Sequence, residues 1–139
     1  QILDDKTLAI PDRPGNRRLD TLHNVLEQPQ VGLMFVVPGR GEVLRVAGTG
    51  RIVTDPDLLA TMAVRERLPL LALVVEIDEV MFHCGKSIIR SKLWSPEAWP
   101  NIKGLASYAE CLDDQTTSDE TVTEMETRFR SWHDGNELY

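Results

Sequence analysis

The sequence predicts a mainly β fold, a mostly antiparallel barrel with peripheral helices. Short apolar segments of strand length alternate with turn residues, and only two or three segments with helical spacing lie between them. The connection from Val37 to Val43 is too short for a crossover helix, which excludes a doubly wound parallel sheet. The 139 residues predict one domain, 1–139, in which residues 101–139 form a helical C-terminal extension.

The chain is expected to begin with a strand and a helix. Residues 7–11 have strand character, and Pro14-Gly15 then marks a turn. Asn16 is a suitable N-cap for a helix over residues 17–28, and Pro29 ends that helix. Its apolar side chains share one helical face. They are Leu19, Leu22, Val25 and Leu26.

Two strands joined by a tight turn are expected next. Residues 31–37 are continuously apolar, as in a strand buried on both sides. The Pro-Gly-Arg-Gly turn at 38–41 leads into a strand over 42–53, whose alternation places Leu44 and Arg45 on opposite faces. Gly48 and Gly50 within this strand predict a bulge or a sharp bend.

The remaining elements alternate between helix and strand. Thr54 or Asp55 can cap a helix over 56–67, and a strand over 70–80 follows. Residues 82–94 have helical character. A last helix over 118–132 is amphipathic through Val122, Met125, Phe129 and Trp132.

Composition narrows the classes of partner and compartment. The net charge of -7 argues against nucleic-acid binding, and no apolar run approaches the roughly 20 residues that span a bilayer. Cys84 and Cys111 form neither a disulfide framework nor a zinc spacing, so we expect a cytoplasmic protein without a metal site.

Residues 10–22 carry the strongest indication of a ligand. Arg17 and Arg18 in a first helical turn oppose the helix dipole, which is unfavourable unless an anion binds there. A phosphate would gain free backbone N–H groups, the dipole and two guanidinium groups. The alternative is a solvated basic helix start that pairs with Asp12 and Asp20, and the residues alone favour neither.

Four ordered pieces between Leu8 and Val53 resemble the flavin-binding stretch of the pyridoxamine 5'-phosphate oxidase-like split-barrel family. In that family a strand ends in a loop, a basic pair opens a helix, and an Arg-x-x-Gly element follows on a later strand. The matching pieces here are Ile10 to Asp12, Asn16-Arg17-Arg18, Gln28-Pro29-Gln30 and Arg45-Val46-Ala47-Gly48.

A second segment is similar to a bacterial branch of FMN-binding members. Phe82 to Trp94 fits the pattern FHCxKxxxRSxLW. If this segment is helical, Lys86, Arg90 and Trp94 lie on one face at intervals of four residues. The alternative is a surface stripe that pairs with Glu97 and nearby acids.

The resemblance implies a split β-barrel that binds FMN at the interface of a homodimer. Arg17 and Arg18, helped by Asn16, would hold the phosphate, and Arg45 would lie near the ring system. The implied cofactor-binding residues are Ile10, Pro11, Asp12, Asn16, Arg17, Arg18, Arg45, Lys86, Arg90 and Trp94. Ile10 to Asp12 would contact the flavin through their backbone, and Lys86 and Arg90 would reach the flavin or the substrate.

The sequence also departs from the family. Relatives have strands before the equivalent of Leu3, so we expect a barrel shortened at its N-terminus. The Arg-x-His element of the true oxidase has no match, since Arg128-Phe129-Arg130 does not fit it. We therefore expect an FMN-dependent oxidoreductase of another small molecule, without an assigned catalytic side chain. The alternatives are a non-catalytic carrier of flavin or another phosphate ligand, and a structural dimer without ligand.

Overall fold

The computed structural model describes residues 1–15 and 18–133 and contains two compact units, 1–99 and 100 onward. The strands are β1 (Ile2–Asp4), β2 (Thr7–Pro11), β3 (Gln30–Val36), β4 (Val43–Val53) and β5 (Ala72–His83). The helices are α1 (Asp20–Glu27), α2 (Pro56–Ala60), α3 (Lys86–Ser91), α4 (Tyr108–Gln115) and α5 (Val122–His133), with a 3₁₀ turn at Pro96–Ala98.

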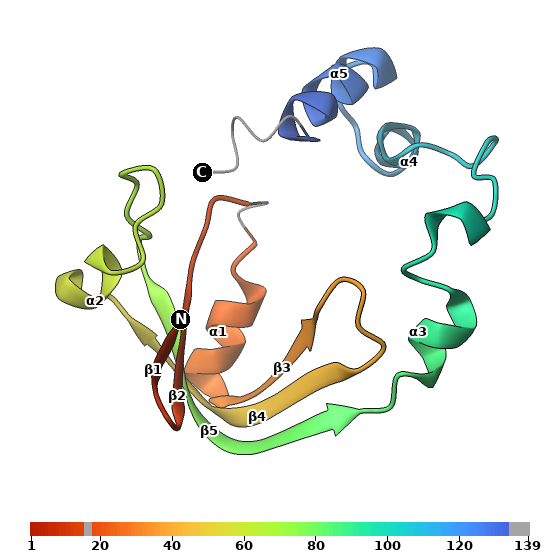
Figure 1. The fold of residues 1–139 in the computed structure, drawn as a ribbon. Coiled ribbons are helices and arrows are strands. Elements are labelled where there is room, and N and C mark those ends of the chain that lie inside the picture. Colours follow the sequence, from red (N-terminus) through yellow and green to blue (C-terminus); the bar gives the residue numbers. More distant parts are fainter. Residues whose placement is uncertain (16–17, 134–139) are drawn as a thin grey trace. The chain divides into compact units, whose positions relative to one another are not determined.

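The five strands form one antiparallel sheet in the order β1-β2-β5-β4-β3 (Figure 1). β1 and β3 are its edges, so the sheet is not closed. The predicted mainly β fold with peripheral helices is confirmed, and the open sheet is consistent with a split barrel.

Each face of the sheet is covered by a different helix. α2 packs on the outer face, where Leu59 and Met62 join a buried core with Ala9, Ala72 and Val74. α1 lies on the inner side of the curved sheet and buries Val25 (Figure 1). α1 contacts β4, and the two helices leave residues 34–36 of β3 and 78–83 of β5 exposed.

The pairing is irregular at Gly48, where a bulge or bend was predicted, but the extra residue belongs to the neighbouring strand β5. The register between β4 and β5 shifts between Ala47 and Gly48, because β5 places one extra residue, Asp78, in the pairing. A Cβ on Gly48 would collide with the carbonyl oxygen of Glu76. Glycine is therefore required at this position by the close approach of the neighbouring strand.

The predicted start of the first helix is wrong by three residues. α1 begins at Asp20, and Leu19 is its N-cap without a side-chain cap bond. Arg18 therefore precedes the helix, whereas Asn16 and Arg17 lie outside the described residues. Asp20 suits a first turn because its negative charge favours the positive end of the helix dipole, where arginine is disfavoured.

The prediction that residues 31–37 form a strand buried on both sides is also wrong. β3 is a strand, but it lies at the edge of the sheet, and Met34, Phe35 and Val36 are exposed. A continuous apolar run does not distinguish a central strand from an edge strand whose apolar side chains are buried by a binding partner.

The second helix is shorter than predicted. α2 ends at Ala60, and residues 64–67 form a tight turn in which Arg65 and Glu66 have φ angles of 49° and 63°. These left-handed conformations cannot continue a right-handed helix.

The cap of α2 gives a first testable prediction. The Asp55 carboxylate accepts a hydrogen bond of 2.8 Å from the Leu58 backbone N–H. Asp55→Ala should lower the free energy of unfolding by about 1 kcal/mol, measured by urea denaturation. Asp57→Ala is the control, because Asp57 lies in the same first turn without this cap role. Equal losses in the two variants would contradict the assignment.

The segment 82–94 is not one continuous helix. Phe82 and His83 are the last residues of β5, and α3 starts only at Lys86. The β-branched and aromatic residues at the end of β5 continue the pairing with β4, which outweighs the helical spacing.

The C-terminal unit contains α4 and α5, which contact each other through Tyr108 and Phe129, with ring centroids 5.1 Å apart. Ser107 and Glu110 form a capping box at the start of α4. Met125 is buried, as the amphipathic pattern predicts, while the side chain of Trp132 lies outside the described part. Within the described ranges, no helix has the length and apolar character needed to cross a membrane.

Candidate functional site

A hollow of about 400 Å³ lies on the outer face, where β3, β4 and β5 run side by side. Met34, Arg45 and Met81 occupy neighbouring positions across the three strands, and the next row holds Gly32, Ala47 and Glu79. The small residues Gly32 and Ala47 form the bottom of the hollow. The thioethers of Met34 and Met81 and the guanidinium of Arg45 form its border. This size and chemistry suit a flat ring with polar edges.

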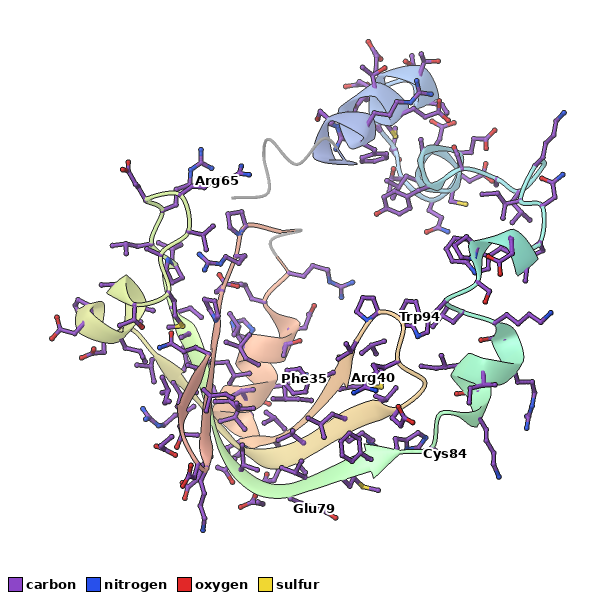
Figure 2. The ribbon with its side chains drawn as sticks, viewed as in Figure 1. Phe35, Arg40, Arg65, Glu79, Cys84 and Trp94 are labelled. Atoms are coloured by element: carbon purple, nitrogen blue, oxygen red, sulfur yellow. The ribbon has the colours of Figure 1, made fainter. Side chains whose placement is uncertain are left out.

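Arg45 is the predicted site residue that this hollow contains. Its side chain is exposed and makes no hydrogen bond or ion pair with the residues that the structure describes. Glu79 and His83 line the same hollow, with Glu79 projecting from the side of the sheet opposite Phe35 (Figure 2). The hollow therefore offers a cation, an acid and an imidazole on one surface.

The predicted residues of β2 lie at the end of that strand. Ile10 and Pro11 pair with Leu73 and Ala72 of β5, and the Asp12 N–H donates to the Leu71 carbonyl at 2.9 Å. On the other side, the last backbone contact described is between Ala9 and Gln1. The backbone from Ile10 onward thus has one edge in the sheet and a second edge without a described strand beside it.

The basic loop before α1 contains one arginine with a structural role. The Arg13 guanidinium donates to the Met62 carbonyl at 2.5 Å, which fastens the loop to the segment after α2. Arg18 pairs with Asp20 at 2.9 Å, as the alternative interpretation of this loop expected, and its side chain is 74% exposed. Such an exposed pair is weak, so a stronger anion can compete with Asp20 for the guanidinium.

The C-terminal predicted residues separate into two groups. Lys86 and Arg90 lie on α3 one turn apart, are exposed, and form no ion pair within the described ranges. Trp94 lies beyond the helix, because Lys92 adopts a left-handed conformation and ends it. The predicted single helical face of all three residues is therefore wrong.

The carboxylates with shifted pKa values owe the shifts to hydrogen bonds within turns and helices, outside the hollow. The Lys6 backbone N–H lowers the pKa of Asp4, and side-chain hydrogen bonds from Arg128 lower the pKa of Glu120. Neither carboxylate lines the outer-face hollow. No three His, Cys, Asp or Glu side chains gather as metal ligands within residues 1–15 and 18–133.

Among the residues of the hollow that sequence reasoning missed, four carry a thioether, a carboxylate or an imidazole group. They are Met34, Glu79, Met81 and His83. The signal for the three residues of β5 was the alternation of 79, 81 and 83, which places every second side chain on the face of Arg45 once the register is known. Cys84, which follows β5 directly, is exposed.

The N-terminal part of the chain matches a known family. A strand, a basic loop, a helix, an apolar strand and an Arg-x-x-Gly strand with a bulge follow one another in unit 1. The model of the family described as pyridoxamine 5'-phosphate oxidase matches residues 1–84. The chain belongs to the pyridoxamine 5'-phosphate oxidase-like family. No curated protein and no solved structure gives a match.

The match to the pyridoxamine 5'-phosphate oxidase-like family covers the first 84 residues. The matched part includes the β2 end, the basic loop, Arg45 and the whole of β5. α3 and the C-terminal unit lie outside the match. Members of this family commonly bind FMN or another flavin.

Proposed function

We propose that this chain binds FMN and acts as a flavin-dependent oxidoreductase on a small molecule. The observation that carries the proposal is the family match over residues 1–84, within which the basic loop and Arg45 both lie. Bound flavin would supply the redox chemistry, while the protein binds and orients it.

The phosphate of FMN is assigned to the loop before α1. Arg17 and Arg18 hold it in this proposal, with Asn16 beside them. Arg18 is exposed and its pairing with Asp20 is weak, so exchanging the carboxylate for a phosphate dianion is favourable. Ile10, Pro11 and Asp12 then lie along the cofactor with the backbone edge that faces away from β5.

The ring system is assigned to the surface around Arg45 of the second copy in the proposed homodimer. Within one chain the two sites are too far apart, because Pro11 pairs with Ala72 whereas Arg45 pairs with Met81, nine positions further along β5. The low floor at Gly32 and Ala47 admits a planar group, and the guanidinium can donate to its carbonyl oxygens. Lys86 and Arg90 of α3 complete the proposed set of residues that contact the cofactor, and Trp94, the last residue that the resemblance implied, lies just beyond this helix.

We assign the exposed apolar end of the sheet to a homodimer interface. On the inner face, Phe35, Val37, Val80 and Phe82 form what we term the inner apolar patch, and their exposed fractions range from 38% to 75%. Met34 and Met81 are exposed on the outer face of the same strands. Apolar surface on both faces of one sheet end is typical of an interaction site, and the family often forms dimers.

Flavin binding is tested by an absorbance scan from about 300 to 550 nm with and without added FMN. The double variant Arg17→Ala/Arg18→Ala should bind FMN at least about a hundredfold more weakly, because two charge-assisted hydrogen bonds are lost. Arg51→Ala/Arg130→Ala is the matched control, since it removes two exposed arginines outside the proposed site. Wild-type protein that binds no flavin would refute the proposal.

Turnover separates an oxidoreductase from a carrier of flavin. Reduced nicotinamide and an electron acceptor are added to the flavin-loaded protein, and the consumption of both is followed. Catalysis above that of free FMN supports the enzyme. Flavin binding without such turnover for these and other donors would instead identify a carrier.

A further inference from the structure

α3 is attached to the turn between β3 and β4 at the point where the helix begins. Gly85 lies directly against the backbone of Gly41, and a Cβ on Gly85 would collide with the Gly41 carbonyl oxygen. A Cβ added to Gly41 would instead meet Ile89 of α3 at an ordinary distance of 3.5 Å. The first turn of α3 is thus packed against the hairpin.

The same hairpin is held a second time beyond the end of α3. The indole N–H of Trp94 donates to the Arg40 carbonyl oxygen at 2.6 Å, across 54 positions in the sequence. Figure 2 shows Trp94 directed toward the hairpin from the segment after β5. The ring is about one-third exposed, so the bond lies at the surface of the unit.

A local turn produces this geometry. Lys92 has φ and ψ angles of 52° and 40°, and its N–H is directed at the Ile88 and Ile89 carbonyls. The Leu93 N–H also donates to the Ile88 carbonyl, at 3.2 Å. This C-terminal cap reverses the chain, so Trp94 returns toward the hairpin instead of continuing along the helix.

We propose that Trp94 is a positioning residue, which holds α3 against the hairpin at Arg40 so that Lys86 and Arg90 are presented to an anionic ligand. The inference rests on the proposed flavin site and gives Trp94 a role through α3 rather than through stacking. A helix of six residues has little stability of its own, so its contacts with the hairpin determine its position. Gly85 fixes one end of the helix and Trp94 the other.

The expected effect follows from the loss of a single hydrogen bond. Trp94→Phe keeps an aromatic ring but removes the indole N–H, so the anchored state of α3 becomes less populated. One hydrogen bond corresponds to about a fivefold change in that equilibrium. FMN affinity follows the populated fraction of the anchored state, so it should fall by up to about the same factor. Trp99→Phe is the matched control, because its indole N–H donates only to the nearby Leu93 carbonyl, at 3.2 Å.

The decisive experiment is a double-mutant cycle on the full chain, with FMN as the probe. Trp94→Phe should weaken FMN binding by up to about fivefold in the wild-type background but have no further effect in Lys86→Ala/Arg90→Ala. Amide hydrogen exchange without FMN should show faster exchange in α3 of Trp94→Phe and no change in Trp99→Phe.

Each alternative has its own signature. An additive loss in the cycle, with unchanged exchange in α3, would overturn the proposal in favour of direct contact between Trp94 and the ligand. Unchanged FMN affinity in Trp94→Phe would overturn it while leaving the proposed function intact. A wild-type protein that binds no FMN would overturn both, even if hydrogen exchange showed that Trp94 anchors α3.

Discussion

Replacing Gly48 with alanine is expected to destabilise the protein by about 3 kcal/mol or more. The new Cβ would lie far inside the van der Waals contact distance of the Glu76 carbonyl oxygen, and 3.0 Å from a methyl group of Val75. The obstacle is backbone of the adjacent strand rather than a flexible side chain, so the two central strands must separate or lose the bulge. For a chain of this length the melting temperature should fall by roughly 10 °C.

Gly32→Ala provides the control for this prediction. Gly32 is also a strand glycine near the hollow, yet a Cβ there meets nothing within 4 Å. Its melting temperature, measured by circular dichroism, should stay within about 2 °C of the wild-type value or rise slightly. Equal behaviour of the two alanine variants would show that the close approach at Gly48 does not exist in solution.

The second large effect is expected at the inner apolar patch. Phe82 is 75% exposed in the single chain, so Phe82→Asp should leave the fold of the monomer intact. In the proposed dimer the same change buries a carboxylate among Phe35, Val37 and Val80. A central aromatic residue typically contributes 2–4 kcal/mol to an interface, so the dimer dissociation constant should rise at least about a hundredfold.

Sedimentation velocity over a range of concentrations measures this effect. Leu70→Asp is the control, because Leu70 is 84% exposed but precedes β5, at the opposite end from Phe82. If the flavin is bound between the two copies, Phe82→Asp should also weaken FMN binding in proportion to the loss of dimer. A wild-type monomer at all concentrations, or a Phe82→Asp dimer of unchanged stability, would contradict the assignment.

The sequence predicted the strands better than the helices. Thr7–Pro11 was placed correctly because a proline ends it, and β4 was placed within one residue because two turns border it. The bulge was predicted from Gly48, since a strand glycine often marks close backbone approach. These features are set by neighbours in the sequence.

The errors arose where tertiary contacts decide the outcome. The apolar run of β3 does not reveal whether it is central or at an edge, because the answer depends on strand order. The helical spacing of Lys86, Arg90 and Trp94 was real, but the left-handed Lys92 ends α3 before Trp94 is reached. A non-glycine residue in that conformation leaves no sequence signal.

Only the arginine motifs of the site could be predicted from the sequence. Arginine pairs and an Arg-x-x-Gly element can be recognised in a sequence, whereas Glu79 and His83 join Arg45 through the register of two strands. That register depends on the bulge at Asp78, which moves every later side chain of β5 to the other face.

β5 has a buried first part and an exposed second part. From Ala72 to Val75 its side chains are buried or nearly so, whereas from Asp78 to His83 all of them are exposed in the single chain. Mutational tolerance should therefore change along one continuous strand. Polar substitutions in the first part should impair folding itself. Those in the second part should leave folding intact and affect only dimer formation and ligand binding. Divergence between relatives should accordingly concentrate in the second part, where new partners and substrates can be accommodated without altering the core.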